Sequence, residues 1–190
     1  MRTFIAIELP QEIKDYLACL QEKLKATGAD VKWVAPQNIH LTLKFLGEID
    51  DSKLEKIVGI IGAVSEEKPR FQISISSLGA FPKIQFPRVI WVGVEQGDRE
   101  TKEIAKTLEE KLQKAGIPKE ERAFSSHITI GRTRSGLNTN KLAQEMNMLG
   151  KEIQVKNLGF KAERITLFKS TLTSKGPIYE ILKEASLKTN

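Results

Sequence analysis

Cysteine is almost absent from this chain of 190 residues, and Cys19 is its only example. One cysteine cannot form an intrachain disulfide or a cysteine-rich zinc site, so we expect neither. The apolar run Phe4–Ile7 near the start is interrupted by Glu8, and no run approaches the roughly 20 residues of a membrane span. These absences favour a globular, cytoplasmic protein without a membrane segment.

Histidine is nearly as scarce, so any histidine chemistry must use His40, His127 or both. The sequence contains no His-x-x-x-His or Asp-x-Asp pair, and we therefore expect no metal and no cofactor. The basic excess is moderate, with 30 Lys and Arg against 24 Asp and Glu and a net charge of +6. Such an excess fits either a solvated surface or a face that attracts phosphates, and composition does not separate the two.

Apolar spacing predicts helices alternating with strands in an α+β protein. The length suits one domain or two small lobes. Strand pairs separated by short turns near the C-terminus favour antiparallel or mixed sheets over a parallel sheet. The expected helices are 11–26, 51–64, 98–115 and 139–149, and the expected strands are 3–9, 40–46, 71–78, 88–94, 126–131, 151–158, 163–171 and 178–187.

The two halves of the chain repeat one pattern with little identity. Arg2 opens a strand, a helix follows, and His40 comes 38 residues later. Arg88 opens a strand, a helix follows, and His127 comes 39 residues later. We therefore expect a bilobal fold with pseudo-twofold symmetry, in which two sheets with flanking helices enclose a central cleft.

The histidines lie in matching motifs, NIHLTLKF at 38–45 and SSHITIGR at 125–132, and both contain His-x-Thr-x. Alternate side chains of a strand share a face, so each histidine should lie beside a threonine, Thr42 or Thr129, with aliphatic neighbours buried behind. A single motif of this kind is usually structural or merely exposed. Two copies that use both histidines of the chain indicate a shared site.

Two such pairs can supply acid–base catalysis at a phosphate. An imidazole with a pKa near 6.5 can act as base or as acid at neutral pH, and a threonine hydroxyl can donate to an anionic oxygen. Arg132, five residues after His127, is the best candidate for a cation that holds phosphate oxygens. Displacement at phosphorus relies mainly on positioning and electrostatics, and this scheme requires no metal.

Other side chains have weaker claims on the site. Arg134 could assist as a second cation. Lys44 shares the strand parity of His40, so it would point to the cleft or to solvent, whereas Phe45 should be in the core. Cys19 falls within a helix and is most simply structural. Four aromatic residues could stack a base but are more simply packing residues: Trp33, Phe81, Trp91 and Tyr179.

The two motifs resemble those of the two-histidine phosphoesterase superfamily. NIHLTLKFLGE at 38–48 and HITIGR at 127–132 are similar to motifs of the RNA 2′,3′-cyclic phosphodiesterases, also called 2′-5′ RNA ligases. The opening MRTFIAI and the tail segments STLT at 170–173 and GPIY at 176–179 are similar to theirs as well. The resemblance covers essentially the whole chain, although Gly131 stands where many relatives carry alanine.

The resemblance implies a LigT-like bilobal α+β fold and metal-independent opening of a 2′,3′-cyclic phosphate on RNA to a 2′-phosphate. It implies that His40 donates a proton to the leaving oxygen, that His127 activates water, and that Thr42 and Thr129 hold the phosphate. The near symmetry of the motifs leaves the acid and base roles open from the residues alone, and reverse ligation would exchange them.

We therefore expect residues 1–190 to form a single domain of two lobes, with the motifs His40–Leu43 and His127–Ile130 in one lobe each. The expected partner is RNA with a 2′,3′-cyclic phosphate end, or a small cyclic nucleotide, and the expected state is a monomer. The alternatives are 2′-5′ ligation or hydrolysis of another cyclic nucleotide at the same site, a non-catalytic RNA or nucleotide-binding module, and a structural domain with incidental histidines.

Overall fold

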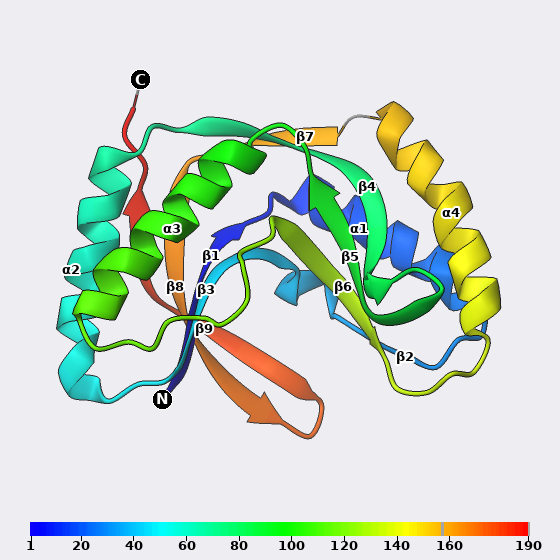
Figure 1. Ribbon diagram of the computed structural model, residues 1–190, viewed down its shortest axis with the longest axis horizontal. Helices are drawn as coiled ribbons and strands as arrows, with labels where there is room; N and C mark the ends of the chain where they lie inside the picture. Colours follow the sequence, from blue (N-terminus) through cyan, green and yellow to red (C-terminus); the bar gives the residue numbers. More distant parts are fainter. Residues whose placement is uncertain (157, 190) are drawn as a thin grey trace.

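The structure is a computed structural model that describes residues 1–156 and 158–189. The described residues form two antiparallel sheets flanked by four α-helices (Figure 1), which confirms the α+β prediction and the antiparallel option within it. The four-stranded sheet has the order β3 (His40–Glu48), β1 (Arg2–Glu8), β8 (Arg164–Thr173), β9 (Gly176–Ser186). The five-stranded sheet has the order β2 (Val31–Trp33), β6 (His127–Thr133), β5 (Phe86–Val94), β4 (Phe71–Lys83), β7 (Leu158–Ala162).

The helices divide between the two sheets. The helices α2 (Asp51–Glu67) and α3 (Asp98–Lys114) pack beside the four-stranded sheet, and α1 (Gln11–Lys25) and α4 (Thr139–Lys156) pack beside the five-stranded sheet. Apolar side chains three and four residues apart face inward on each helix because that spacing matches the helical repeat. On α4 the fully or almost fully buried side chains are Leu142, Met146, Leu149 and Ile153.

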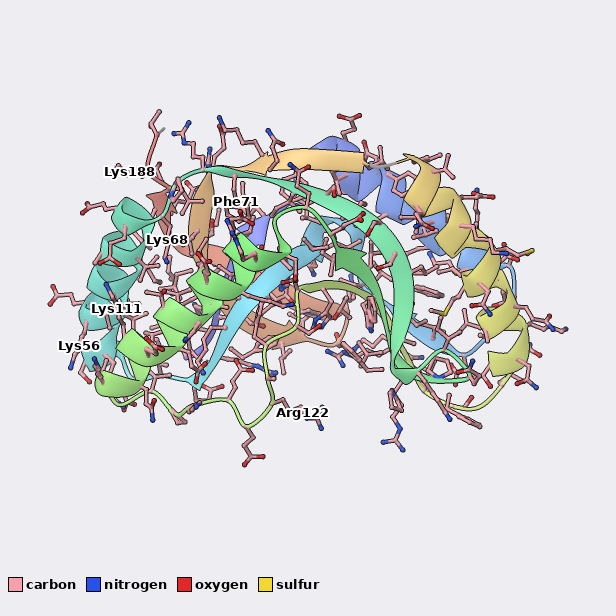
Figure 2. The ribbon with its side chains drawn as sticks, turned by 45° about the horizontal axis from the view of Figure 1, so that its top comes forward. Lys56, Lys68, Phe71, Lys111, Arg122 and Lys188 are labelled. Carbon is pink, nitrogen blue, oxygen red and sulfur yellow. The ribbon has the colours of Figure 1, made fainter. Side chains whose placement is uncertain are left out.

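Much of the basic charge lies on the outer helices. Figure 2 shows Lys56 of α2 and Lys111 of α3 at this surface, and Lys111 Nζ is 2.6 Å from Glu67 Oε1. A surface pair of this kind contributes little to stability, and these two lysines fit the interpretation of the basic excess as a solvated surface.

The two halves of the sequence exchange strands. β4 follows α2 in the first half, yet it pairs with β5 in the five-stranded sheet. β8 follows the second motif, yet it pairs with β1 in the four-stranded sheet. The orders β3-β1-β8 and β6-β5-β4 therefore correspond, and each sheet contains strands from both halves.

The C-terminal end of α4 differs from the prediction. A helix ending near Gly150 and a strand over 151–158 were expected, but residues 151–156 continue the helix, 157 lies outside the described residues, and Leu158 begins β7. Ile153 is fully buried and continues the apolar stripe of α4, so tertiary burial outweighs the roughly 1 kcal/mol cost of glycine in a helix. The three-residue strand β2 and the 3₁₀ turn Pro36–Asn38 were not predicted.

Candidate active site

Each sheet carries one histidine motif at the start of a strand. His40 is the first residue of β3, His127 is the first residue of β6, and these two strands contact each other. The charge of Arg132, in the second motif, also acts on Tyr179 of the four-stranded sheet. Burial raises the pKa of Tyr179, while the charges of Arg2 and Arg132 lower it. Since the Tyr179 ring packs edge-on against His40, with centroids 5.5 Å apart, Arg132 of β6 lies close to the surroundings of His40.

Both imidazoles are held by the same backbone contact. His40 Nδ1 is 2.7 Å from the carbonyl oxygen of Asn38, and His127 Nδ1 is 2.8 Å from the carbonyl oxygen of Ser125. A carbonyl oxygen only accepts, so Nδ1 of each ring carries the hydrogen and donates it. The other ring nitrogen, Nε2, is left without a proton in the neutral form and is available to a substrate.

A β-bulge interrupts both motifs at the same place. Thr42 lies opposite Ala6 and Lys44 lies opposite Ile5, so Leu43 is an extra residue in β3. Thr129 lies opposite Trp91 and Gly131 lies opposite Ile90, so Ile130 is an extra residue in β6. An extra residue reverses the alternation of side chains beyond it.

The bulge in β3 overturns two expectations about the first motif. Lys44 is buried, with 1% of its side chain exposed, and its Nζ lies 2.8 Å from Glu109 Oε2 and 3.0 Å from the carbonyl oxygen of Pro118. Phe45 is 52% exposed instead of lying in the core, and it lies opposite Phe4. Strict alternation from His40 fails because Leu43 shifts the register by one residue.

The bulge in β6 brings Arg132 to the face of the strand that carries His127. A spacing of five residues in a regular strand would place Arg132 on the opposite face from His127. With Ile130 as an extra residue, Arg132 is exposed on the face of His127 and Thr129, opposite Val89. Arg132 lies close enough to His127 for its positive charge to lower the pKa of the imidazole.

His40 is enclosed by aromatic rings. Its ring stacks on Phe4 at 4.7 Å between centroids, and Phe168 lies at 6.4 Å. This burial lowers the pKa of His40 from 6.5 to about 4; the Asn38 carbonyl opposes the shift and the charge of Lys14 adds to it. In the free protein His40 is therefore neutral at pH 7.

His127 has a more open setting. Phe81 packs edge-on against its ring at 5.0 Å, and Trp91 lies at 6.4 Å. Burial lowers the pKa of His127, the Ser125 carbonyl opposes the shift, and Arg132 lowers the pKa further. Both histidines are thus held in the neutral form without a bound anion, for partly different reasons.

The weaker candidates separate by position. Phe81, Trp91 and Tyr179 contact the histidines, whereas a Cβ on Gly131 would come 2.9 Å from the Trp33 ring, so Trp33 packs behind the second motif. Cys19 is exposed on α1, and Arg134 lines a cavity outside the two motifs. Phe4 and Phe168 were not singled out, although the alternation Phe4, Ala6, Glu8 in β1 could have placed Phe4 on one face.

The described residues contain no group of three or more His, Cys, Asp or Glu side chains placed to hold a metal ion. No helix in this part of the chain combines the length and apolarity needed to cross a membrane.

Comparison with known proteins gives consistent matches over the whole chain. A family described as LigT-like phosphoesterase matches residues 7–91 and again 92–179, so that each match includes one motif. An RNA 2′,3′-cyclic phosphodiesterase of Methanocaldococcus jannaschii is 39% identical over 97% of this chain and 99% of its own length. One of Thermotoga maritima is 36% identical over 99% and 96%.

Solved structures are similar in fold. The Escherichia coli LigT complexed with 3′-AMP has a TM-score of 0.77 and 25% identity, covering 98% of this chain and 97% of that one. The protein TT0787 of Thermus thermophilus has a TM-score of 0.81 and 25% identity, with complete coverage of both chains.

Proposed function

The chain belongs to the LigT-like phosphoesterase family, and we propose that it is an RNA 2′,3′-cyclic phosphodiesterase that opens the terminal cyclic phosphate to a 2′-phosphate. The observation that carries this function is the matched pair of imidazoles. Each is fixed through Nδ1 to a backbone carbonyl, which leaves two Nε2 atoms free to exchange protons with one phosphate.

The proposed reaction assigns His127 as base and His40 as acid. His127 Nε2 removes a proton from water as the water oxygen bonds to phosphorus. The bond from phosphorus to the 3′ oxygen breaks, and His40 Nε2 delivers a proton to that oxygen. Thr42, Thr129 and the Arg132 guanidinium bind the remaining phosphoryl oxygens, where charge accumulates in the transition state.

His40 takes up the proton that it donates from solvent when the anionic substrate binds. The pKa of His40 is about 4 in the free protein, so it carries almost no positive charge at pH 7. A phosphate anion next to the ring favours the protonated form and raises its pKa, and this effect is strong in a buried aromatic setting. His127 lies beside Arg132, whose charge opposes protonation and keeps this ring suited to the role of base.

The partner is RNA with a cyclic phosphate end, and a small cyclic nucleotide offers the same reacting group. We further propose that residues 1–190 act as one catalytic unit and as a monomer, because both motifs come from the same chain. We also propose that the protein acts in the cytoplasm. Exposed Phe45, on the His40 face, provides a ring on which a nucleobase can stack.

The test is hydrolysis of a 2′,3′-cyclic mononucleotide and of a short RNA with a cyclic phosphate end, with EDTA present. We expect turnover to a 2′-phosphate, read by phosphorus NMR, and losses of about 10²–10⁴-fold in both His40→Ala and His127→Ala. The control is Cys19→Ser, an exposed site on α1, which should retain full activity. A clean wild-type protein that binds RNA but turns over neither substrate would exclude the enzyme and favour a binding module.

A further inference from the structure

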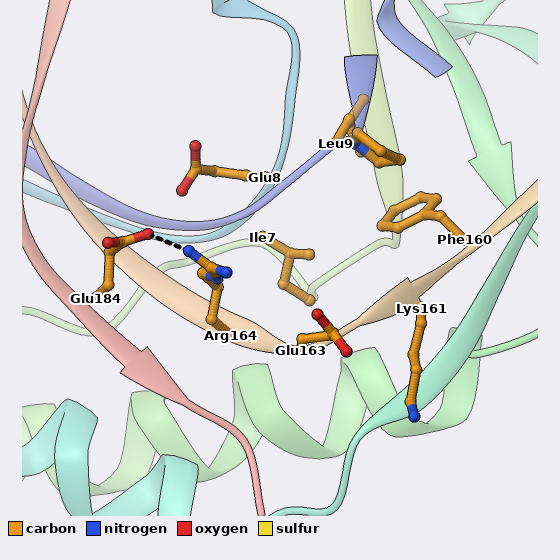
Figure 3. A pocket seen from close by; sticks show the side chains of 9 residues that line it. Ile7, Glu8, Leu9, Phe160, Lys161, Glu163, Arg164 and Glu184 are labelled. Carbon is orange, nitrogen blue, oxygen red and sulfur yellow. Dashed lines mark hydrogen bonds and ion pairs between the residues drawn. The ribbon is translucent and has the colours of Figure 1, made fainter. Parts of the chain in front are cut away.

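Two cavities formed by described residues outside the paired motifs differ in their charges. The first, of about 490 Å³, lies along β1, β8 and β9 (Figure 3). Its lining includes the carboxylates of Glu8, Glu163 and Glu184, and Arg164 Nη1 is only 2.7 Å from Glu184 Oε1. Three acids outnumber the two cations of the wall, Lys161 and the already paired Arg164, so this cavity does not favour a phosphate.

The second cavity, of about 510 Å³, is lined by cations without acids. It lies where β5 begins, β6 ends and α4 begins, and we name it the Arg88–Arg134 pocket. Its polar lining consists of the two arginines and three hydroxyl residues, Thr133, Ser135 and Thr139.

Hydrogen-bond donors in this pocket remain available. Among the described residues the arginine ion pairs belong to Arg70, Arg99 and Arg164, so the guanidinium groups of Arg88 and Arg134 are not neutralised. Ser135 Oγ accepts from the backbone N–H of Leu137 and keeps its own hydrogen to donate. The hydroxyls of Thr133 and Thr139 already donate to backbone carbonyls. Two guanidinium forks and one hydroxyl can therefore bind an anion.

The pocket lies at the strand end next to the second histidine motif. Arg132 lies opposite Val89, and the next residues along the two strands, Thr133 and Arg88, are about 3.3 Å further on and on the other face of the sheet. A single strand of RNA that starts at His127 therefore reaches the pocket by bending around the ends of β5 and β6. The ring of Phe86, 67% exposed, also lines the pocket, and Lys83 Nζ lies 5.1 Å from its centroid. A cationic groove with an exposed aromatic ring is the combination that binds single-stranded nucleic acid.

We propose that the Arg88–Arg134 pocket binds an internal phosphodiester of the substrate RNA, upstream of its cyclic phosphate end. This proposal rests on the proposed function, because it places the reacting end at the two histidines. The pocket then gives preference for a polynucleotide over a mononucleotide, which is too short to occupy both places.

The experiment compares kcat/KM for a 2′,3′-cyclic mononucleotide with kcat/KM for oligoribonucleotides of increasing length that end in the same cyclic phosphate. For wild type we expect a step upward once the oligonucleotide reaches the pocket. Arg88→Ala and Arg134→Ala should each lower kcat/KM for long substrates by about tenfold, through KM, and leave the mononucleotide unchanged. The log–log salt dependence for long substrates should become shallower by about 0.7 per arginine removed.

The matched control is Arg99→Ala, which removes the same charge from α3, where Arg99 pairs with acids of its own helix. It should leave both the length step and the salt slope as in wild type. An arginine effect equal for all substrate lengths, or none for the long ones, would overturn the proposal. A free nucleotide as the true ligand would also overturn it, and would appear as ATP binding that Arg88→Ala abolishes while the length step persists.

Failure of the proposed function has a different signature. If no cyclic phosphate is hydrolysed, fluorescence anisotropy with a labelled oligonucleotide ending in 2′-phosphate still measures the pocket. Weaker binding of that oligonucleotide in Arg88→Ala and Arg134→Ala, but not in Arg99→Ala, supports the pocket independently of turnover. Equal binding by all four proteins refutes it.

Discussion

The strands β3 and β6 begin with the same backbone arrangement and differ most in the two side chains that follow the bulge. Both begin with a histidine bonded to the carbonyl two residues earlier, and both contain a bulge three residues after that histidine. The fourth and fifth residues after the histidine are Lys44 and Phe45 in β3, and Gly131 and Arg132 in β6. The shared backbone presents two similar imidazoles, and the differing residues make their surroundings unequal.

This difference bears on how two copies of one motif can perform opposite proton transfers. His40 lies among Phe4, Phe168 and Tyr179, where a proton is stable only with an anion beside it. His127 lies beside the positive charge of Arg132. These neighbours make His40 an acid that becomes protonated when the anionic substrate binds. They make His127 a base that Arg132 keeps neutral.

The largest effect on activity should come from the fifth residue after each histidine, Arg132 in β6 and Phe45 in β3. Arg132→Ala should lower kcat/KM on a cyclic phosphate about 10²-fold, because a charge-assisted donor to the transition state is lost. Phe45→Ala should cost about tenfold, since it removes only a stacking surface. The control Lys32→Ala removes a charge from the cross-strand neighbour of Arg132 on β2 and should cost little. Equal losses at Arg132 and Phe45 in steady-state kinetics would contradict the division of roles.

The next effect concerns stability against pH. The pKa of His40 is about 4 in the fold and 6.5 in an unfolded chain, so between these values the unfolded state binds a proton that the folded state refuses. The stability present above pH 6.5 is therefore lost as pH falls, by about 2 kcal/mol at pH 5. His40→Phe should remove this part of the loss, and His127→Phe should remove less, because His127 is less enclosed.

Urea unfolding at pH 7.5 and pH 5 measures these differences, and NMR resolves the two imidazoles because the chain has no others. A 2′-phosphate product added to the sample should raise the pKa of His40. A His40 that titrates near 6.5 in the free protein would refute the aromatic enclosure as the cause of its asymmetry.

A smaller effect is expected at Lys44, the fourth residue after His40 in β3. Lys44→Met should lower the free energy of unfolding by about 1.5 kcal/mol, because Glu109 loses the partner of a largely buried ion pair and is itself 19% exposed. Lys111→Met breaks the surface pair with Glu67 and should cost less than about 0.5 kcal/mol. Denaturant unfolding measures both, and similar values would mean that Lys44 is effectively solvated.

The sequence predicted the paired motifs and most elements because those depend on local pattern. Alternation placed Leu41 and Ile128 in the core, and both are fully buried. The sequence did not predict that Lys44 is buried and Phe45 exposed, because a bulge is set by pairing with a strand distant in sequence. The strand exchange of β4 and β8 was likewise missed, since nothing in either strand specifies which sheet it joins. For the same reason the aromatic enclosure of His40 became visible only when β1, β8 and β9 were placed beside β3.

The smallest expected effect is at Gly131, the fourth residue after His127 in β6. A Cβ on Gly131 would lie 2.8 Å from Val31 Cγ1 and 2.9 Å from the Trp33 ring, so Gly131→Ala requires both side chains to move. β2 is only three residues long and its Val31 and Trp33 are half-buried, so it can shift at a cost of about 1 kcal/mol in the free energy of unfolding. Catalysis should persist, because the displaced groups lie behind the strand, on the side opposite His127 and Arg132. Thermal unfolding together with kcat/KM tests this: a stable variant with much reduced kcat/KM would show that the bulge itself had moved, and that the glycine fixes the position of Arg132.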